Sequence, residues 1–305
     1  MLRGSEKLPP SLQTTTDGGS RWSLRKWAYR WQIGGDTLYA KTLVSHKLLI
    51  FQASELSTTS DGSRIVSGWP AIDGQFPYML FVRGVNQFGH VMGCGGSIIH
   101  ARWGLTSGRC TVQRVNLILS AGMVNINRPR LTFETTTYHQ APGFEDMPIS
   151  QPNDLALIGF NRDIQFNAYI QPIRLQRSAD RQKDYTGVLM STAGWGTTFT
   201  PDWKHHWIHL VGVNNFVCLL MVNSNWLVRD TTVCAQHYNV TSQSICSGDS
   251  GVPLTILDTD NRPTQVGVAS FVVSWGCHVG FPAGFVRPGF FQEWMREVTG
   301  INFDW

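Results

Sequence analysis

Short runs of apolar and β-branched residues recur along the chain from residue 65 onward, and Gly, Pro or Asn separates them. Clear examples lie at residues 77–82, 115–119 and 154–160. Such runs with turn residues between them are typical of strands in sandwiches and barrels, whereas parallel α/β units would interleave strands with helices. The pattern predicts a mostly β domain.

A helical period occurs only near the C-terminus. Phe291, Trp294, Met295 and Val298 recur at intervals of three and four, so they share one face of a helix. Gly300 follows where a helix C-cap is expected. We therefore expect an all-β fold closed by one terminal helix over about residues 290–300.

Residues 1–64 differ in composition from the rest. Trp and Arg cluster in residues 21–31, and Ser, Thr and Gly dominate residues 54–63, which is typical of a flexible linker. The longest apolar run here, residues 48–51, is shorter than the roughly 7–15 residues of a signal-peptide core. We assign this region no fold and treat it as a leader or propeptide. The alternatives are an artefact of gene prediction and a cationic aromatic cluster that contacts anionic membrane.

The formal net charge of +4 belongs to that leader, because residues 1–64 hold nine Lys and Arg against five Asp and Glu. The other 241 residues hold 16 of each. The main domain therefore lacks the basic excess by which nucleic-acid-binding proteins are recognised. No stretch approaches the ~18 apolar residues of a membrane span. We expect neither a nucleic-acid partner nor a membrane span.

The chain has six widely spaced cysteines: Cys94, Cys110, Cys218, Cys234, Cys246 and Cys277. They form no close pairs with the His partners of a zinc site, and no metal or cofactor is expected. An even number of dispersed cysteines favours disulfides and an oxidising compartment. Six buried free thiols in a cytosolic enzyme are the alternative.

The strongest chemical signal is the segment Cys246-Ser-Gly-Asp-Ser-Gly-Val-Pro-Leu254, in which glycines lie near Ser250. A serine on such a tight turn exposes its hydroxyl while neighbouring backbone amides converge on an oxyanion. The segment resembles the nucleophile loop of chymotrypsin/trypsin-like serine proteases. Four more motifs follow the order of that family: Cys94-Gly-Gly-Ser97, Ile170-Gln-Pro-Ile173, Ser191-Thr-Ala-Gly-Trp-Gly196 and Ser274-Trp-Gly276.

The resemblance covers residues 65–305 and is closest to the chymotrypsin-like and collagenase-like digestive enzymes of arthropods. It implies two six-stranded antiparallel β-barrels, about residues 65–178 and 179–290, with a cleft between them and a C-terminal helix. It also implies a secreted monomer that a trypsin-like protease activates. The cysteine pairing that it implies is Cys94 with Cys110, Cys218 with Cys234, and Cys246 with Cys277.

The resemblance further implies the roles of individual residues. Ser250 matches the nucleophile, Asp154 the buried carboxylate of the triad, and the amides of Gly248 and Ser250 the oxyanion hole. The family places its histidine in a Thr-Ala-Ala-His-Cys run, and the corresponding run here is Thr106-Ser-Gly-Arg-Cys110. Arg109 therefore occupies the position of the general base.

A guanidinium has no acceptor and stays protonated, so Arg109 cannot act as a base. None of the nine histidines occupies a family position for a substitute. Arg109 is expected instead to pair with Asp154, which would otherwise be buried without a partner. Val252 stands where most members have glycine, and we expect strain there if the backbone requires positive φ.

The activation sequence of the family is present, because Arg64 precedes Ile65-Val-Ser-Gly68. Cleavage after Arg64 would free the Ile65 amine to pair with Asp249. The residues expected to form the specificity pocket are Ser244 at its base together with Ser274, Trp275, Gly276 and Gly284. Because the base has no carboxylate, large apolar side chains are favoured over Lys or Arg.

Three functions remain open. The first is a protease homologue that binds a polypeptide substrate or a protease inhibitor without turnover, since the site rather than the fold decides function. The second is an active secreted endopeptidase of chymotrypsin-like specificity, in which Arg109 is a sequence error. The third is slow cleavage assisted by a histidine of the substrate.

Overall fold

The computed structural model describes residues 68–147, 149–196, 204–223, 226–272, 277 and 279–305, and the backbone of residues 26–33, 36–45 and 48–49. The chain divides into two units, Met1–Ser60 and Asp61–Trp305. The first contains an antiparallel sheet of β1 (Lys26–Ile33), β2 (Asp36–Ser45) and β3 (Leu48–Leu49), in a region to which the sequence assigned no fold.

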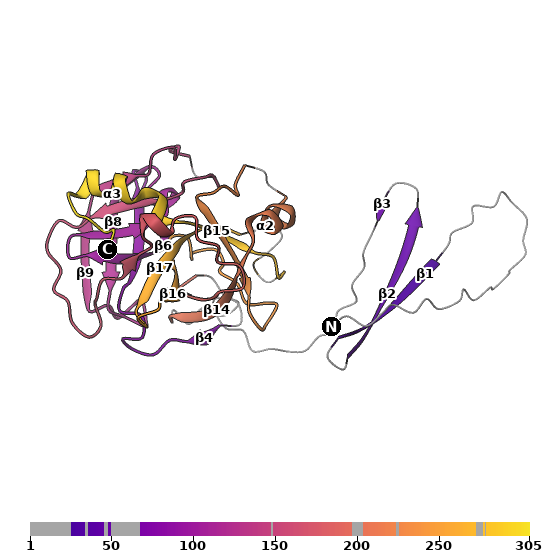
Figure 1. Ribbon diagram of the computed structural model, residues 1–305. Coiled ribbons are helices and arrows are strands. Elements are labelled where there is room, and N and C mark those ends of the chain that lie inside the picture. The colour runs from indigo at the N-terminus through magenta and orange to yellow at the C-terminus, as the bar shows by residue number, and fades with distance from the viewer. Residues whose placement is uncertain are drawn as a thin grey trace, which may run out of the picture. The chain divides into compact units, whose positions relative to one another are not determined.

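The N-terminal half of the second unit is one curled antiparallel sheet of seven strands, in the order β10-β11-β7-β6-β5-β8-β9. Strands β6, β8 and β9 of this sheet are labelled in Figure 1. The apolar runs predicted at residues 77–82, 115–119 and 154–160 contribute to β5, β8 and β11. The strands are β5 (Met79–Asn86), β6 (Val91–His100), β7 (Trp103–Thr106), β8 (Arg114–Ala121), β9 (Leu131–Thr135), β10 (Tyr138–Gln140) and β11 (Ala156–Gly159).

The C-terminal half is a closed barrel of six antiparallel strands, because β17 pairs with both β16 and β18 and completes the ring β17-β16-β13-β14-β15-β18. A short strand, β12 (Arg174–Leu175), adds to β17 in parallel, and β4 (Trp69–Pro70) adds to β14. The barrel strands are β13 (Leu189–Gly194), β14 (His206–Val213), β15 (Thr232–His237), β16 (Pro253–Leu257), β17 (Pro263–Phe271) and β18 (Ala283–Val286). The curled sheet and the barrel together form the expected chymotrypsin-like fold.

The expected C-terminal helix is α3 (Gln292–Thr299), which follows a 3-10 turn, η3 (Pro288–Phe291). Met295 is fully buried in the barrel core, and Trp294 and Val298 pack against it. Gly300 ends the helix with a φ of 71°, a conformation that glycine adopts without a Cβ clash. The predicted terminal helix is confirmed.

A second helix, α2 (Asn215–Val222), was not expected from the sequence. The side chain of Asn214 caps its first turn by accepting a hydrogen bond from the Phe216 amide at 2.9 Å. Cys218 anchors the helix to β15. Phe216 and Leu220 remain 68% and 62% exposed on its outer face.

Three disulfides stabilise the second unit, and they are the three pairs that the resemblance implied. Two of them lie beside functional elements: one ties β6 to the turn after β7, and another ties the Ser250 loop to the segment after β17. No free cysteine occurs in the described part of the chain.

The Ser250 turn packs directly against the N-terminal sheet. The Gly95 amide on β6 donates to the Ser250 carbonyl oxygen at 2.8 Å. A Cβ on Gly251 would overlap the Gly95 carbonyl oxygen and the Thr106 hydroxyl. A Cβ on Gly95 would overlap the Val252 side chain. Glycine is required where the two halves meet, because their backbones approach so closely.

Replacing Gly95 with Ala is expected to lower the free energy of unfolding by about 1–3 kcal/mol, because the added Cβ overpacks a fixed site. It would lie 3.2 Å from both the backbone nitrogen and the Cα of Val252, which cannot rotate away. Urea denaturation measures the loss. Gly93→Ala, on the same strand, is the matched control, because its Cβ would make an ordinary contact at 3.4 Å with Phe81. Equal effects of the two substitutions would contradict the argument.

Candidate functional site

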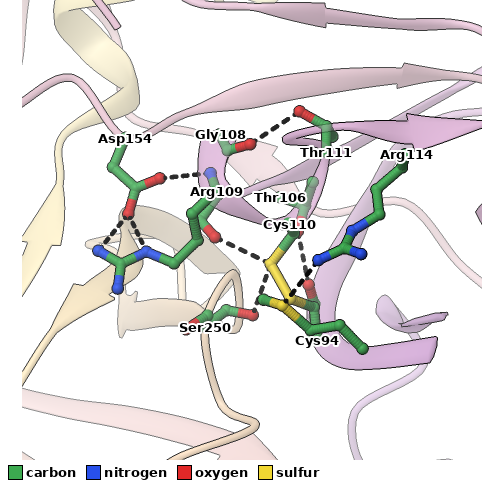
Figure 2. Close-up of a disulfide and its surroundings, with 12 residues drawn as sticks. Cys94, Thr106, Gly108, Arg109, Cys110, Thr111, Arg114, Asp154 and Ser250 are labelled. Carbon is green, nitrogen blue, oxygen red and sulfur yellow. Dashed lines mark hydrogen bonds and ion pairs between the residues drawn. A yellow bond between two sulfur atoms is a disulfide. The ribbon is translucent and has the colours of Figure 1, made fainter. Parts of the chain in front are cut away.

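Arg109 lies in a 3-10 turn, η1 (Gly108–Cys110), that follows β7. The disulfide of Cys110 fixes one end of this turn to β6. Gly108 has no room for a side chain, because a Cβ there would lie 2.9 Å from the ring of Phe144. The turn is therefore held in place, and the Arg109 side chain extends from it toward Asp154 (Figure 2).

Asp154 is fully buried and precedes β11. Its Oδ1 accepts a hydrogen bond from the Arg109 amide at 2.8 Å, and its Oδ2 accepts from Arg109 Nε at 2.8 Å. Arg109 Nη2 also lies 2.8 Å from Oδ2 (Figure 2). The expected pairing of Arg109 with Asp154 is present in the structure.

Ser270 completes the surroundings of Asp154, because its hydroxyl donates to Oδ2 at 2.8 Å. Burial raises the pKa of the Asp154 carboxyl above its ordinary value, while the charge of Arg109 and the hydrogen bonds lower it. A guanidinium is a permanent cation, so Arg109 favours the ionised form of the Asp154 carboxyl. In that form the two opposite charges offset each other inside the protein.

Ser250 lies on a turn with positive φ at Gly248 (94°) and Gly251 (88°). Its carbonyl oxygen is held by the Gly95 amide, and the Cys110 sulfur lies 3.7 Å from the same oxygen (Figure 2). Its hydroxyl has no hydrogen-bond partner among the residues that the structure describes. Nothing in that part of the chain is placed to remove its proton.

The strain expected at Val252 is not present. Val252 has no positive φ, since the preceding glycine takes the left-handed conformation instead. Its side chain is fully buried and fills the space beside Gly95 and Gly194. The condition for strain at Val252 is not met, because the turn has its positive φ one position earlier.

Asp249 is fully buried beneath the same turn. Its two carboxylate oxygens accept hydrogen bonds from the amides of Gly196, at 2.8 Å, and Cys246, at 2.9 Å. No ion pair of Asp249 occurs within the described residues. Burial raises the pKa of Asp249 to about 6, against the smaller opposing effect of the two amides.

A hollow of about 180 Å³ opens beside Ser250. Of the described residues that line it, Arg109 alone is charged. The other polar lining residues are four serines: Ser150, Ser247, Ser250 and Ser270. No histidine among the described residues lines it.

The apolar side of the hollow is formed by Ile245, Phe271 and Val272. Ser244 is buried next to Ile245 and is not one of the described residues that line the hollow. Gly284, another of the residues expected to form the pocket, packs against a neighbouring side chain. A Cβ on Gly284 would overlap the ring of Phe271, so that ring already fills the space.

Ser270 is the site residue that the sequence analysis missed. Its hydroxyl contacts both members of the Arg109–Asp154 pair, at 3.4 Å from Arg109 Nη2 and 2.8 Å from Asp154 Oδ2. The segment Ser270-Phe-Val272 has the same pattern of serine, aromatic and small residue as Ser274-Trp-Gly276, four residues later. The later motif was chosen because it matches the family better, but Ser274, Trp275 and Gly276 lie outside the described residues, as do Arg64 and Ile65.

Within the described residues, no group of three or more His, Cys, Asp or Glu side chains could hold a metal ion. No helix in that part of the chain is long and apolar enough to cross a membrane.

Comparison with known proteins defines the class. The family described as Trypsin matches residues 65–295, so the chain belongs to the trypsin family of serine proteases. A protein named Serine protease 1 from Drosophila melanogaster is 30% identical over 249 residues, which cover 79% of this chain and 87% of the relative. A trypsin-like domain with three disulfides is consistent with an extracellular protein.

Collagenases are similar to this chain in both sequence and structure. The collagenase of Hypoderma lineatum is 28% identical over 258 residues, which cover 85% of this chain and 93% of the relative. A solved structure of HL collagenase has a TM-score of 0.70 and 27% sequence identity, and the match covers 77% of this chain and 98% of that one. The expected likeness to the collagenase branch is therefore found.

Replacing Asp154 with Ala is expected to lower the free energy of unfolding by about 3–5 kcal/mol, because a largely buried guanidinium loses its counter-ion. Chemical denaturation measures the change. Asp73→Ala is the control, since it breaks an exposed ion pair with Arg130 and should cost no more than about 1 kcal/mol. An unchanged melting temperature for Asp154→Ala would count heavily against a structural role for the pair.

Asp249 makes the stability of the chain depend on pH. Its folded pKa of about 6 lies above the ordinary 3.8, so the folded protein binds this proton more tightly than the unfolded chain does. The resulting stabilisation is complete below about pH 4 and is lost as the pH rises through about 6. The loss amounts to about 3 kcal/mol. Denaturation of the uncut chain at pH 4 and pH 7, compared with Asp249→Asn, measures it, and equal pH dependence in both would refute it.

Proposed function

We propose that this chain is a secreted serine protease homologue that binds a polypeptide substrate or a protease inhibitor in its cleft without cleaving it. The observation that carries the proposal is the contact between Arg109 and Asp154 beside a Ser250 hydroxyl that has no base. In this proposal Ser250 occupies the nucleophile position, Asp154 the carboxylate position, and Arg109 the position of the family histidine.

The chemistry of Arg109 supports the loss of turnover. A general base must accept the serine proton and return it to the leaving amine, and a guanidinium has no lone pair for either step. Loss of the histidine in a related triad costs on the order of 10⁶ in kcat, equivalent to ~8 kcal/mol of barrier. Transition-state binding alone still accelerates the reaction roughly 10³–10⁴-fold over the uncatalysed reaction in water.

The remaining parts of the cleft support binding. Within the described residues, the amides of Gly248 and Ser250, which we assign to the oxyanion hole, donate to no other group. The hollow beside them offers an apolar wall for one side chain of a bound polypeptide. The free amides and the apolar wall can both bind an extended polypeptide, whether or not its peptide bond is cleaved.

Asp249 supports activation by a trypsin-like protease. Cleavage after Arg64 would create an amine on Ile65, and a buried carboxylate with a raised pKa is a strong acceptor for such a charge. We propose that this ion pair orders the Ser250 turn, since Asp249 already holds the amides of Gly196 and Cys246. Processing would then regulate binding rather than catalysis.

A second candidate is an active endopeptidase of chymotrypsin-like specificity. Two relatives named Serine protease 1 and Collagenase, which are 30% and 28% identical to this chain, favour it. It requires a proton acceptor for Ser250 that the described residues do not provide. A single substitution separates the two candidates.

Arg109→His is expected to raise kcat/KM on a chromogenic peptide by on the order of 10³ or more, because it restores a base beside Asp154. The peptide carries Phe or Leu before the scissile bond, and both proteins are first cut after Arg64 and repurified. Addition of Ser250→Ala to this variant should abolish the gain, which excludes a contaminating protease. Robust activity of the unsubstituted chain that survives repurification would instead establish the endopeptidase.

A further inference from the structure

The guanidinium of Arg109 is only partly used by Asp154. Nε and Nη2 point at the carboxylate, whereas Nη1 points away from it and has no partner in the described part of the chain (Figure 2). The side chain is 16% exposed and lines the hollow beside Ser250. Arg109 therefore presents charged N–H donors to whatever occupies the cleft.

The charge of the site differs from that of a catalytic triad at rest. A neutral histidine beside an ionised aspartate leaves a net charge of −1, which repels an anionic ligand. Arg109 brings the pair to zero, and no other charged residue among those described lines the hollow. An anion can therefore enter this site without meeting an uncompensated carboxylate.

Donor and acceptor chemistry then selects the ligand. In an internal peptide bond, the group next to the carbonyl is an N–H, which would face the donors of Arg109 with no acceptor between them. In a terminal carboxylate, the second oxygen takes that position and accepts a charge-assisted hydrogen bond. The first oxygen can accept from the amides of Gly248 and Ser250.

We propose that the site binds the free C-terminal carboxylate of a polypeptide, held between Arg109 Nη1 and the amides of Gly248 and Ser250. This rests on the proposed function as a binding protein and names its ligand class. At the position where catalysis needs an acceptor, the guanidinium of Arg109 offers only donors.

The hollow also restricts the terminal side chain. Its apolar wall consists of Ile245, Phe271 and Val272, and the Phe271 ring fills the space next to Gly284. An apolar terminal side chain, such as that of Ala, Val or Leu, can pack against this wall. A terminal Lys would bury an ammonium beside Arg109 without a counter-ion.

Fluorescence anisotropy with paired peptides tests the proposal on the full chain, both uncut and cut after Arg64. Five peptides end in Ala, Val, Leu, Phe or Lys. Each is made in two forms, one with a free C-terminal carboxylate and one with a C-terminal amide. The free acids that end in Ala, Val or Leu are expected to bind at least about tenfold more tightly than their amides, as for a hydrogen bond to a charged group. Equal affinity of acid and amide in every pair, or no binding of any acid, would overturn the proposal.

Two substitutions test the role of the guanidinium. Arg109→Gln and Arg109→His are expected to remove the preference for the acid. Arg109→His is combined with Ser250→Ala, so that it cannot cleave the peptides, and is measured at pH 8. Arg130→Gln is the matched control, because Arg130 pairs with Asp73 and does not line the hollow, and it should leave the preference unchanged. Retention of the preference in Arg109→His would overturn the assignment of Nη1, even if Arg109→Gln fails to fold.

Mass spectrometry of the same peptides distinguishes this proposal from the proposed function. Cleavage by the unsubstituted chain would refute the function as a non-cleaving binder. The acid preference is then measured with Ser250→Ala, and its persistence would still support the carboxylate site. Intact peptides with no acid preference would refute the carboxylate site alone.

Discussion

The carboxylate of Asp154 is buried between the two halves of the domain, and donors from both halves must meet it. The backbone and side chain of Arg109 come from the N-terminal sheet, and the hydroxyl of Ser270 comes from the last long strand of the barrel. An isolated carboxylate at this depth would be costly, so its donors have to be in place before the fold is stable. One charged group therefore fixes the relative position of the two walls of the cleft.

The same requirement explains how an arginine can replace a histidine without disrupting the fold. Arginine supplies two side-chain donors to Asp154 and a permanent positive charge, which meets the electrostatic need of the buried carboxylate better than a neutral ring would. Catalysis needs the opposite property, a nitrogen that is free to accept a proton. The residue at this position can therefore pair with Asp154 without being able to accept a proton. In this chain Arg109 meets only the first of these two requirements.

The sequence predicted those parts of the molecule that depend on local pattern. Short apolar and β-branched runs between turn residues located β5, β8 and β11, and a period of three to four residues located α3. The chemistry of two ionic side chains predicted the pairing of Arg109 with Asp154. Helix α2 was missed because Phe216, Val217, Leu219 and Leu220 are apolar on nearly every side, which leaves no period to detect. Ser270 and the ring of Phe271 at Gly284 were missed because their roles depend on packing between segments distant in sequence. The sequence left open whether Val252 is strained, since sequence alone does not say which position of the turn carries positive φ.

The exposed face of α2 has a practical consequence for producing the protein. Its outer residues, Phe216 and Leu220, face water, and the bond between Cys218 and Cys234 holds the helix on the barrel. In a reducing cytosol that bond does not form, and the apolar helix is held only by its packing and by the hydrogen bonds of Asn215. Such a segment promotes self-association of newly made chains, so expression in a bacterial cytoplasm favours inclusion bodies. An oxidising secretory route is the appropriate source of material for the binding measurements.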